Sequence, residues 1–214
     1  MRKNIILLGA GSHARVVLDA LRAEGLGRRI LGAVDLYDNP RLSGADLDGI
    51  PVLGTLTDLG RLFRRGARVY VPAIGDNRLR QASCGTAREA GLRARGAAHP
   101  RAILSAGARI GPGAVLCAGV AVNPGARIDA GAILNTGCII EHDCAIGGYA
   151  HIAPGARLAG NVAVGARAWV GLGASIREGI RIGADAVVGA GAVVIRNVPA
   201  GVTVAGIPAK PLQK

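Results

Sequence analysis

The stretch from Asn135 to Cys144, which reads NTGCIIEHDC, holds the residues best suited to chemistry. Glu141, His142 and Asp143 are consecutive there, in a part of the chain otherwise built from Gly, Ala and aliphatic residues. An imidazole can take up a proton near neutral pH, and a neighbouring carboxylate fixes its tautomer and raises its basicity. The sequence therefore predicts that His142 is a candidate general base next to two carboxylates. The alternative is an ordinary solvated surface.

A second histidine, His151, follows nine residues after His142 and favours the catalytic interpretation. Nine residues is one and a half periods of the six-residue repeat described below, so the two rings are expected on different faces or corners of one chain. No cysteine or carboxylate completes a ligand set, so no metal is expected. The serines stand outside any nucleophile-elbow context, which argues against a Ser-His-Asp hydrolase.

A glycine-rich loop at residues 9–14, reading GAGSHA, is the second candidate site. Its GxGxxA spacing lets the backbone approach phosphates, which the amides of a following helix can bind. Asp35 lies 24 residues after Gly11, where an acidic residue often binds a ribose hydroxyl. NAD, a nucleotide-sugar and a purely structural turn all remain open, although His13 at this position points away from a dinucleotide.

Alternating strands and helices must position this loop. Apolar runs predict strands at residues 4–8, 30–34 and 69–74; a short helix is predicted at 57–65 and another helix at 78–90. Apolar residues at helical spacing predict a further helix directly after the loop, namely Ala14, Val17, Leu18 and Leu21. The pattern is that of a small Rossmann-like domain with a parallel sheet.

The second half follows a six-residue repeat. Every sixth position from Leu104 to Val194 is aliphatic, and a small or β-branched residue stands four positions after each. This period is the signature of a parallel β-helix, whose short strands stack on their copies in the next coil. Cys138 and Cys144 occupy the small positions and are expected to be buried and inert. The tail from residue 202 to 214 is expected to cap the helix.

The composition excludes several classes of protein. Hydrophobic residues make up 50% and charged residues 19%, which excludes a disordered chain, and no apolar run approaches the ~18 residues of a membrane span. Aromatics are only 2%, which argues against single-stranded nucleic acid as a partner. The net charge of +12 favours anionic ligands, or reflects a bias toward Arg. The apolar start runs directly into the glycine loop, so a cytoplasmic location is expected rather than export.

Over its whole length the sequence resembles the nucleotide-sugar and sialic-acid acetyltransferases related to PglD and NeuD. The matching segments are the GAGSHA loop, Gly75-Asp76-Asn77, His99-Pro100, NTGCIIEHDC followed by His151, and GIPAK near the end. The resemblance implies a Rossmann-like nucleotide-sugar-binding domain at 1–98. A left-handed β-helix acetyltransferase domain of about five coils, with its C-terminal cap, would occupy 99–214.

The resemblance also implies roles for individual residues. His142 would be the general base, and Asp143 would orient it. The acceptor would be bound by Gly11, Ser12, His13, Asp35, Gly75, Asn77 and Asn135. Acetyl-CoA would be contacted by His151, Leu172 and Ala190.

The implied activity is acetyl-CoA-dependent N-acetylation of a UDP- or GDP-linked amino sugar, without a metal. The alternatives are O-acetylation of sialic acid or another free sugar, a non-catalytic β-helix scaffold, and an NAD-dependent enzyme supported by the glycine loop alone. The family forms trimers with the coenzyme between neighbouring prisms. His142 and the Leu172 and Ala190 contacts are therefore expected to come from different subunits.

Overall fold

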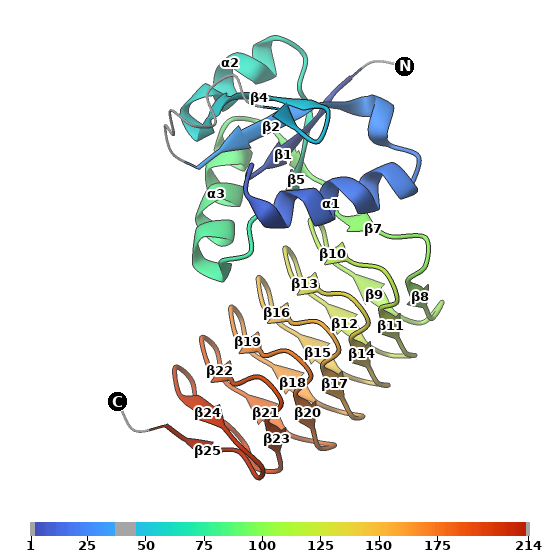
Figure 1. Ribbon diagram of the computed structural model, residues 1–214, viewed down its shortest axis with the longest axis vertical. Coiled ribbons are helices and arrows are strands. Elements are labelled where there is room, and N and C mark those ends of the chain that lie inside the picture. Colours follow the sequence, from blue (N-terminus) through green and yellow to red (C-terminus); the bar gives the residue numbers. More distant parts are fainter. Residues whose placement is uncertain (1–2, 37–45, 213–214) are drawn as a thin grey trace. The chain divides into compact units, whose positions relative to one another are not determined.

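The computed structural model describes residues 3–36 and 46–212 (Figure 1). The chain divides into two compact units, Met1–Pro100 and Arg101–Lys214. The first unit contains helices and a mainly parallel sheet, and the second consists of short stacked strands.

The sheet of the first unit has the strand order β3-β4-β2-β1-β5-β6. Its centre is fully apolar, because all four residues of β1 are 0% exposed. Neighbouring strands pair in parallel except for β3 and β4, which form an antiparallel hairpin. The strands of this unit are β1 (Ile5–Leu8), β2 (Ile30–Asp35), β3 (Asp46–Leu47), β4 (Ile50–Thr55), β5 (Val69–Pro72), β6 (Arg93–Ala94) and β7 (Ala97–Ala98).

The helices of this unit agree with the predicted pattern in type and order. The longer ones are α1 (Ser12–Ala23) and α3 (Asn77–Glu89); the shorter ones are η1 (Gly27–Arg29), η2 (Leu56–Asp58) and α2 (Leu59–Arg64). The residues predicted for the buried face of α1 are all buried. The helix predicted at 57–65 is divided between the 3-10 turn η2 and α2, and the sequence did not predict β3, β4 or β6.

The loop between β1 and α1 needs one of its glycines for the fold. Gly9 has φ +116°, and a Cβ there would lie 2.7 Å from the carbonyl oxygen of Ala73. Gly11 differs, because its φ is −82° and a Cβ would meet no described atom within 4 Å. Gly9 therefore closes the loop onto the end of β5, whereas Gly11 leaves open space in front of the N-terminus of α1.

The second unit is a parallel β-helix with three sheets. Within this unit the first sheet contains β10, β13, β16, β19, β22, β24 and β25; the second contains β8, β11, β14, β17, β20 and β23; the third contains β9, β12, β15, β18 and β21. From β8 to β20, each strand pairs with the strand 18 residues later, as Ile133 pairs with His151. Three strands make one coil, and the strands from β8 to β22 make the five coils predicted (Figure 1).

The strands of the β-helix have these bounds: β8 (Ile103–Leu104), β9 (Arg109–Ile110), β10 (Val115–Leu116), β11 (Ala121–Val122), β12 (Arg127–Ile128), β13 (Ile133–Leu134), β14 (Ile139–Ile140), β15 (Ala145–Ile146), β16 (His151–Ile152), β17 (Arg157–Leu158), β18 (Ala163–Val164), β19 (Trp169–Val170), β20 (Ser175–Ile176), β21 (Arg181–Ile182), β22 (Val187–Val188), β23 (Val193–Val194), β24 (Thr203–Ala205) and β25 (Lys210–Pro211).

Turns join the strands and form the corners of the coil. The first corner joins the first sheet to the second and contains residues 135–138, 153–156, 171–174 and 189–192. The second corner joins the second sheet to the third and contains residues 123–126, 141–144, 159–162 and 177–180. Successive turns stack by backbone hydrogen bonds, such as that from the Asp143 amide to the Pro124 carbonyl at 3.0 Å. Each corner therefore presents a vertical row of residues 18 positions apart.

Candidate active site

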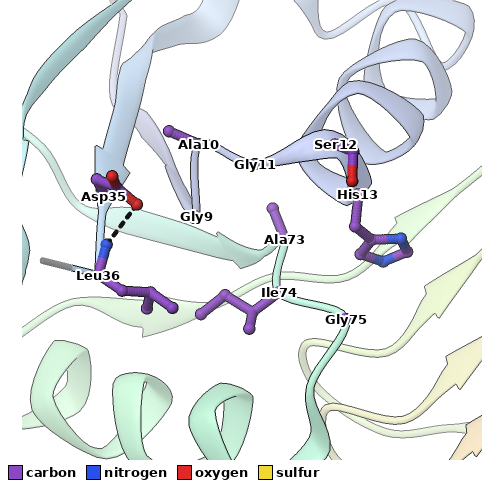
Figure 2. Close-up of a pocket in the computed structure, with 10 residues that line it drawn as sticks. All are labelled: Gly9, Ala10, Gly11, Ser12, His13, Asp35, Leu36, Ala73, Ile74 and Gly75. Carbon is purple, nitrogen blue, oxygen red and sulfur yellow. Dashed lines mark hydrogen bonds between the residues drawn. The ribbon is translucent and has the colours of Figure 1, made fainter. Parts of the chain in front are cut away.

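The glycine loop borders a pocket of about 250 Å³ in the first unit. Five residues predicted to bind the acceptor line it: Gly11, Ser12, His13, Asp35 and Gly75 (Figure 2). Gly9, Ala10, Leu36, Ala73 and Ile74 complete the lining. The Asp35 carboxylate accepts a hydrogen bond of 2.8 Å from the Leu36 amide, which holds it at the end of β2. The pocket lies where the ends of β1, β2 and β5 meet the start of α1, the usual ligand position of a parallel sheet.

His13 borders this pocket as a neutral residue. Burial, and to a smaller extent the nearby positive charge of Arg80, lower the pKa of its imidazole to about 4. At neutral pH His13 therefore contributes hydrogen-bonding groups to the pocket but no positive charge.

Asn77, the remaining acceptor candidate of the first unit, is not part of the pocket lining. It is buried, and its Oδ1 accepts a hydrogen bond of 2.9 Å from the fully buried Arg80, which also donates to the carbonyls of Ile74 and Gly75 at 3.0 and 2.9 Å. Asp76 caps α3 by accepting from the Leu79 amide at 2.8 Å. The GDN segment thus shapes the loop bearing Gly75.

Sequence reasoning missed Arg80, although its spacing offered a signal. Arg80 is three residues after Asn77, on the same face of α3 as the buried Ser83, Cys84 and Ala87. An arginine on the buried face of an amphipathic helix has to bind something, and here it binds the backbone of the pocket wall.

His142 and Asp143 form a pair at the second corner of the β-helix. The His142 Nδ1 lies 3.0 Å from the Asp143 Oδ2, and the two side chains are 56% and 59% exposed. Since an ionised carboxylate only accepts, Nδ1 carries the proton in the neutral form of the imidazole, and in that form Nε2 has a free lone pair. The pair has the tautomer that a general base requires.

His151 is held differently, at the start of β16 beside the first corner. It is 4% exposed, and its ring lies 4.3 Å from that of Trp169. The Asn135 Oδ1 accepts from the Thr136 amide at 2.8 Å, so the Asn135 Nδ2 is the group that meets the His151 Nε2 at 3.1 Å. The His151 Nε2 must accept this bond, which fixes a neutral ring with the proton on Nδ1.

Leu172 and Ala190 stack on one another at the first corner, as the 18-residue spacing predicted. The Leu172 carbonyl accepts from the Gly191 amide at 2.7 Å, and Leu172 is 58% exposed. Asn135 and His151 belong to this corner and its sheet. Within one chain, the structure therefore groups Asn135 with the residues predicted to bind acetyl-CoA and leaves His142 on another corner.

The cysteines of NTGCIIEHDC offer no nucleophile. Cys138 and Cys144 are 0% exposed, as predicted, and Cys144 donates to the Ala159 carbonyl at 3.1 Å. Burial raises the pKa of the Cys138 thiol to about 12 and that of the Cys117 thiol to about 11. Neither Cys138 nor Cys117 therefore provides a thiolate near neutral pH.

Within residues 3–36 and 46–212, no three or more His, Cys, Asp or Glu side chains gather in a way that could hold a metal ion. No helix in the same ranges has the length and apolarity needed to cross a bilayer.

Comparison with known proteins places both units. Residues 4–85 match the family described as the PglD N-terminal domain, and residues 161–196 match the hexapeptide repeat of succinyl-transferase. A comparison with curated proteins finds no match.

Solved structures similar to the chain cover nearly all of it. PerB from Caulobacter crescentus, in complex with CoA and GDP-perosamine, is 41% identical with a TM-score of 0.92 over 98% of this chain and 97% of its own. A histidine-to-asparagine variant of perosamine N-acetyltransferase from Caulobacter crescentus, with the same ligands, is 40% identical with a TM-score of 0.94 over 99% and 97%. The acetyltransferase domain of PglB from Neisseria gonorrhoeae, in complex with acetyl coenzyme A, is 35% identical with a TM-score of 0.89 over 99% and 100%.

Proposed function

The chain belongs to the PglD-like family of hexapeptide-repeat sugar acetyltransferases, and on that basis we propose that it N-acetylates a nucleotide-linked amino sugar with acetyl-CoA. Similarity to a perosamine N-acetyltransferase favours an amine over a hydroxyl as the acceptor group. The similar solved structures are acetyltransferases that hold CoA or acetyl-CoA, which supports acetyl transfer over NAD-dependent chemistry and an enzyme over a non-catalytic scaffold.

The observation that carries the proposal is the exposed His142–Asp143 pair. The Nδ1–H of His142 donates to Asp143, and Nε2 removes a proton from the sugar amine as its nitrogen attacks the thioester carbonyl. The carbon–sulfur bond then breaks, and the CoA thiolate leaves and takes up a proton. The products are the N-acetyl sugar and CoA. A thioester is already activated, so positioning and proton removal suffice.

The pocket of the first unit is proposed to bind the nucleotide. Gly11 leaves space in front of the N-terminal amides of α1, where a diphosphate can approach, and Asp35 is suited to accept from a ribose hydroxyl. His13 is neutral and can bond to a polar group of the acceptor.

We further propose that the enzyme is a homotrimer whose active site combines two subunits. His142 is on the second corner, whereas Leu172, Ala190, Asn135 and His151 are on or beside the first corner, so the second sheet separates the two groups within one chain. A neighbouring prism that presents its first corner would complete the site. The same substrates, acetyl-CoA and a nucleotide-sugar, support a cytoplasmic location.

A thiol-release assay tests the activity. Purified protein is incubated with acetyl-CoA and a panel of GDP- and UDP-linked amino sugars, beginning with GDP-perosamine, each paired with the analogue in which a hydroxyl replaces the amine. We expect CoA release with an amino sugar, and a product heavier by one acetyl group, but no release with its hydroxyl partner. Release only with hydroxyl acceptors would favour O-acetylation, and release with none of the panel would refute the proposal.

A further inference from the structure

We propose that Gly160 is a positioning residue, whose missing side chain keeps the His142 Nε2 open to the acceptor. This inference rests on the proposed role of His142. Gly160 stands directly after His142 in the vertical row of the second corner, one coil of 18 residues later.

The space that a side chain at Gly160 would need is already filled by the His142 imidazole. A Cβ built on Gly160 would lie 2.5 Å from the His142 Nε2 and 2.6 Å from its Cε1. Both distances are far inside van der Waals contact. The ring edge that carries the base nitrogen is thus the part that even a methyl group would displace.

The backbone gives no other reason for a glycine at position 160. Its φ is outside the left-handed region, and the equivalent positions in the neighbouring coils are Pro124, His142 and Glu178, none of which has a positive φ. The same position of the hexapeptide two turns earlier, at the corner between the third and the first sheet, is Gly148, where a Cβ would meet only the Ala130 carbonyl at an ordinary 3.5 Å. The backbone conformation at position 160 would therefore accept a side chain. The His142 ring is what leaves no room for one.

Gly125 leaves space for Asp143, the other member of the pair, as Gly160 leaves space for His142. A Cβ on Gly125 would clash with the Asp143 Oδ1, one coil later in the same corner. Gly125 has φ +75°, yet the equivalent positions Asp143 and Asn161 adopt φ +58° and +61° without being glycine. The backbone conformation therefore does not by itself require glycine at position 125. The space that the Asp143 carboxylate occupies gives a further reason for one.

The backbone holds these positions in register. The Asn161 amide donates to the His142 carbonyl at 3.0 Å, and the Gly160 carbonyl accepts from the Gly179 amide at 3.0 Å. Because both turns are tied into the stack, a methyl group at residue 160 cannot be relieved by moving the coil. The imidazole has to rotate away, which changes both its bond to Asp143 and the position of Nε2.

The test compares Gly160→Ala with the matched control Gly148→Ala and with His142→Ala. We expect Gly160→Ala to lower kcat by about 10²-fold, the usual effect of a displacement of about 1 Å at a reacting group. The KM values for acetyl-CoA and the nucleotide-sugar and the midpoint of thermal unfolding should stay near wild type, and Gly148→Ala should keep the wild-type kcat. In the double variant His142→Ala/Gly160→Ala, the second change should cost nothing, because there is no ring left to displace.

The outcomes separate this inference from the proposed function. A wild-type kcat in Gly160→Ala, or an equal loss in the presence and absence of His142, overturns the role of Gly160 and leaves the general base untouched. Full activity in His142→Ala removes the base itself. If Gly160→Ala does not fold, Gly125→Ala provides a second measurement, because it displaces Asp143 in the way that Gly160→Ala displaces His142. Gly125→Ala should lower kcat by no more than Asp143→Asn does. A larger loss of kcat in folded Gly125→Ala counts against the inference.

Discussion

The exposure of the His142–Asp143 pair sets how much the carboxylate can contribute to the rate. The two side chains are 56% and 59% exposed, and the bond between Nδ1 and Oδ2 is 3.0 Å long. Ion pairs this exposed are worth about 0.2–1 kcal/mol. An amide in place of the carboxylate keeps an oxygen that can accept from Nδ1–H, so Asp143→Asn removes the charge and retains the geometry. Converted to a rate, the loss is at most about fivefold.

The assay is steady-state CoA release at saturating concentrations of both substrates, measured for Asp143→Asn, His142→Ala and the double variant. His142→Ala should lower kcat by about 10²–10⁴, the range for a lost general base. In the double variant Asp143→Asn should add no further loss, because the carboxylate acts only through the ring. A loss above fiftyfold for Asp143→Asn alone would refute the reasoning, since it would require a pair shielded from water. A further loss in the double variant would give Asp143 a role independent of His142.

Four other variants or measurements test the remaining assignments. Gly11→Val should fold, because a Cβ there meets nothing within 4 Å. It should raise the KM for the nucleotide-sugar at least tenfold, and calorimetry should show an unchanged affinity for acetyl-CoA. Loss of acetyl-CoA binding alone would reverse the assignment of ligands to units. Asp35→Ala should act in the same direction more mildly, through hydrogen bonds worth about 1–3 kcal/mol. The free energy of unfolding should rise with pH between about 4 and 6.5, because the pKa of His13 is lowered to about 4 in the folded protein and the unfolded chain binds the extra proton in this range. His13→Gln should remove up to about 3 kcal/mol of this pH dependence. A pH profile that the substitution leaves unchanged would contradict the burial of the ring. Light scattering at micromolar concentration should give the mass of a trimer, and a monomer that is fully active would contradict the shared site.

The β-helix could be predicted from the sequence because its chemistry repeats. Each inward position, such as Ile140 or Ile152, meets the same surroundings one coil later, so one rule of six residues describes every turn. The first unit was less predictable because its strands differ from one another. β4 contains Pro51 and Gly54, two residues that disfavour a strand interior, and its place beside β2 is decided by packing that no local pattern records.

The contacts of the candidate site likewise differ in how far the sequence could predict them. His142 and Asp143 are neighbours in the chain, so their contact was within reach of the sequence. The bond between Asn135 and His151 joins residues 16 positions apart, and the 18-residue coil places His151 on Ile133, only two residues before Asn135. The contact could therefore have been found by subtracting one coil. The helical spacing of Arg80 indicates that it lies on the buried face of α3 with Asn77, but no such arithmetic identifies its other partners, the carbonyls of Ile74 and Gly75 in the loop between β5 and α3.

The reversed strand β25 has a consequence for solubility. The last coil of a parallel β-helix exposes unpaired amides and carbonyls on which another coil could form, so a bare end is a template for chain-to-chain growth. Here β25 runs antiparallel to β24, pairing Lys210 with Ala205 and Pro211 with Val204, and it is the outermost strand of its sheet among the described residues. A proline cannot donate to a further strand, and a lysine resists burial against one. The tail thus acts as a terminator of polymerisation, and a chain cut after Gly206 should associate end to end where the whole chain does not.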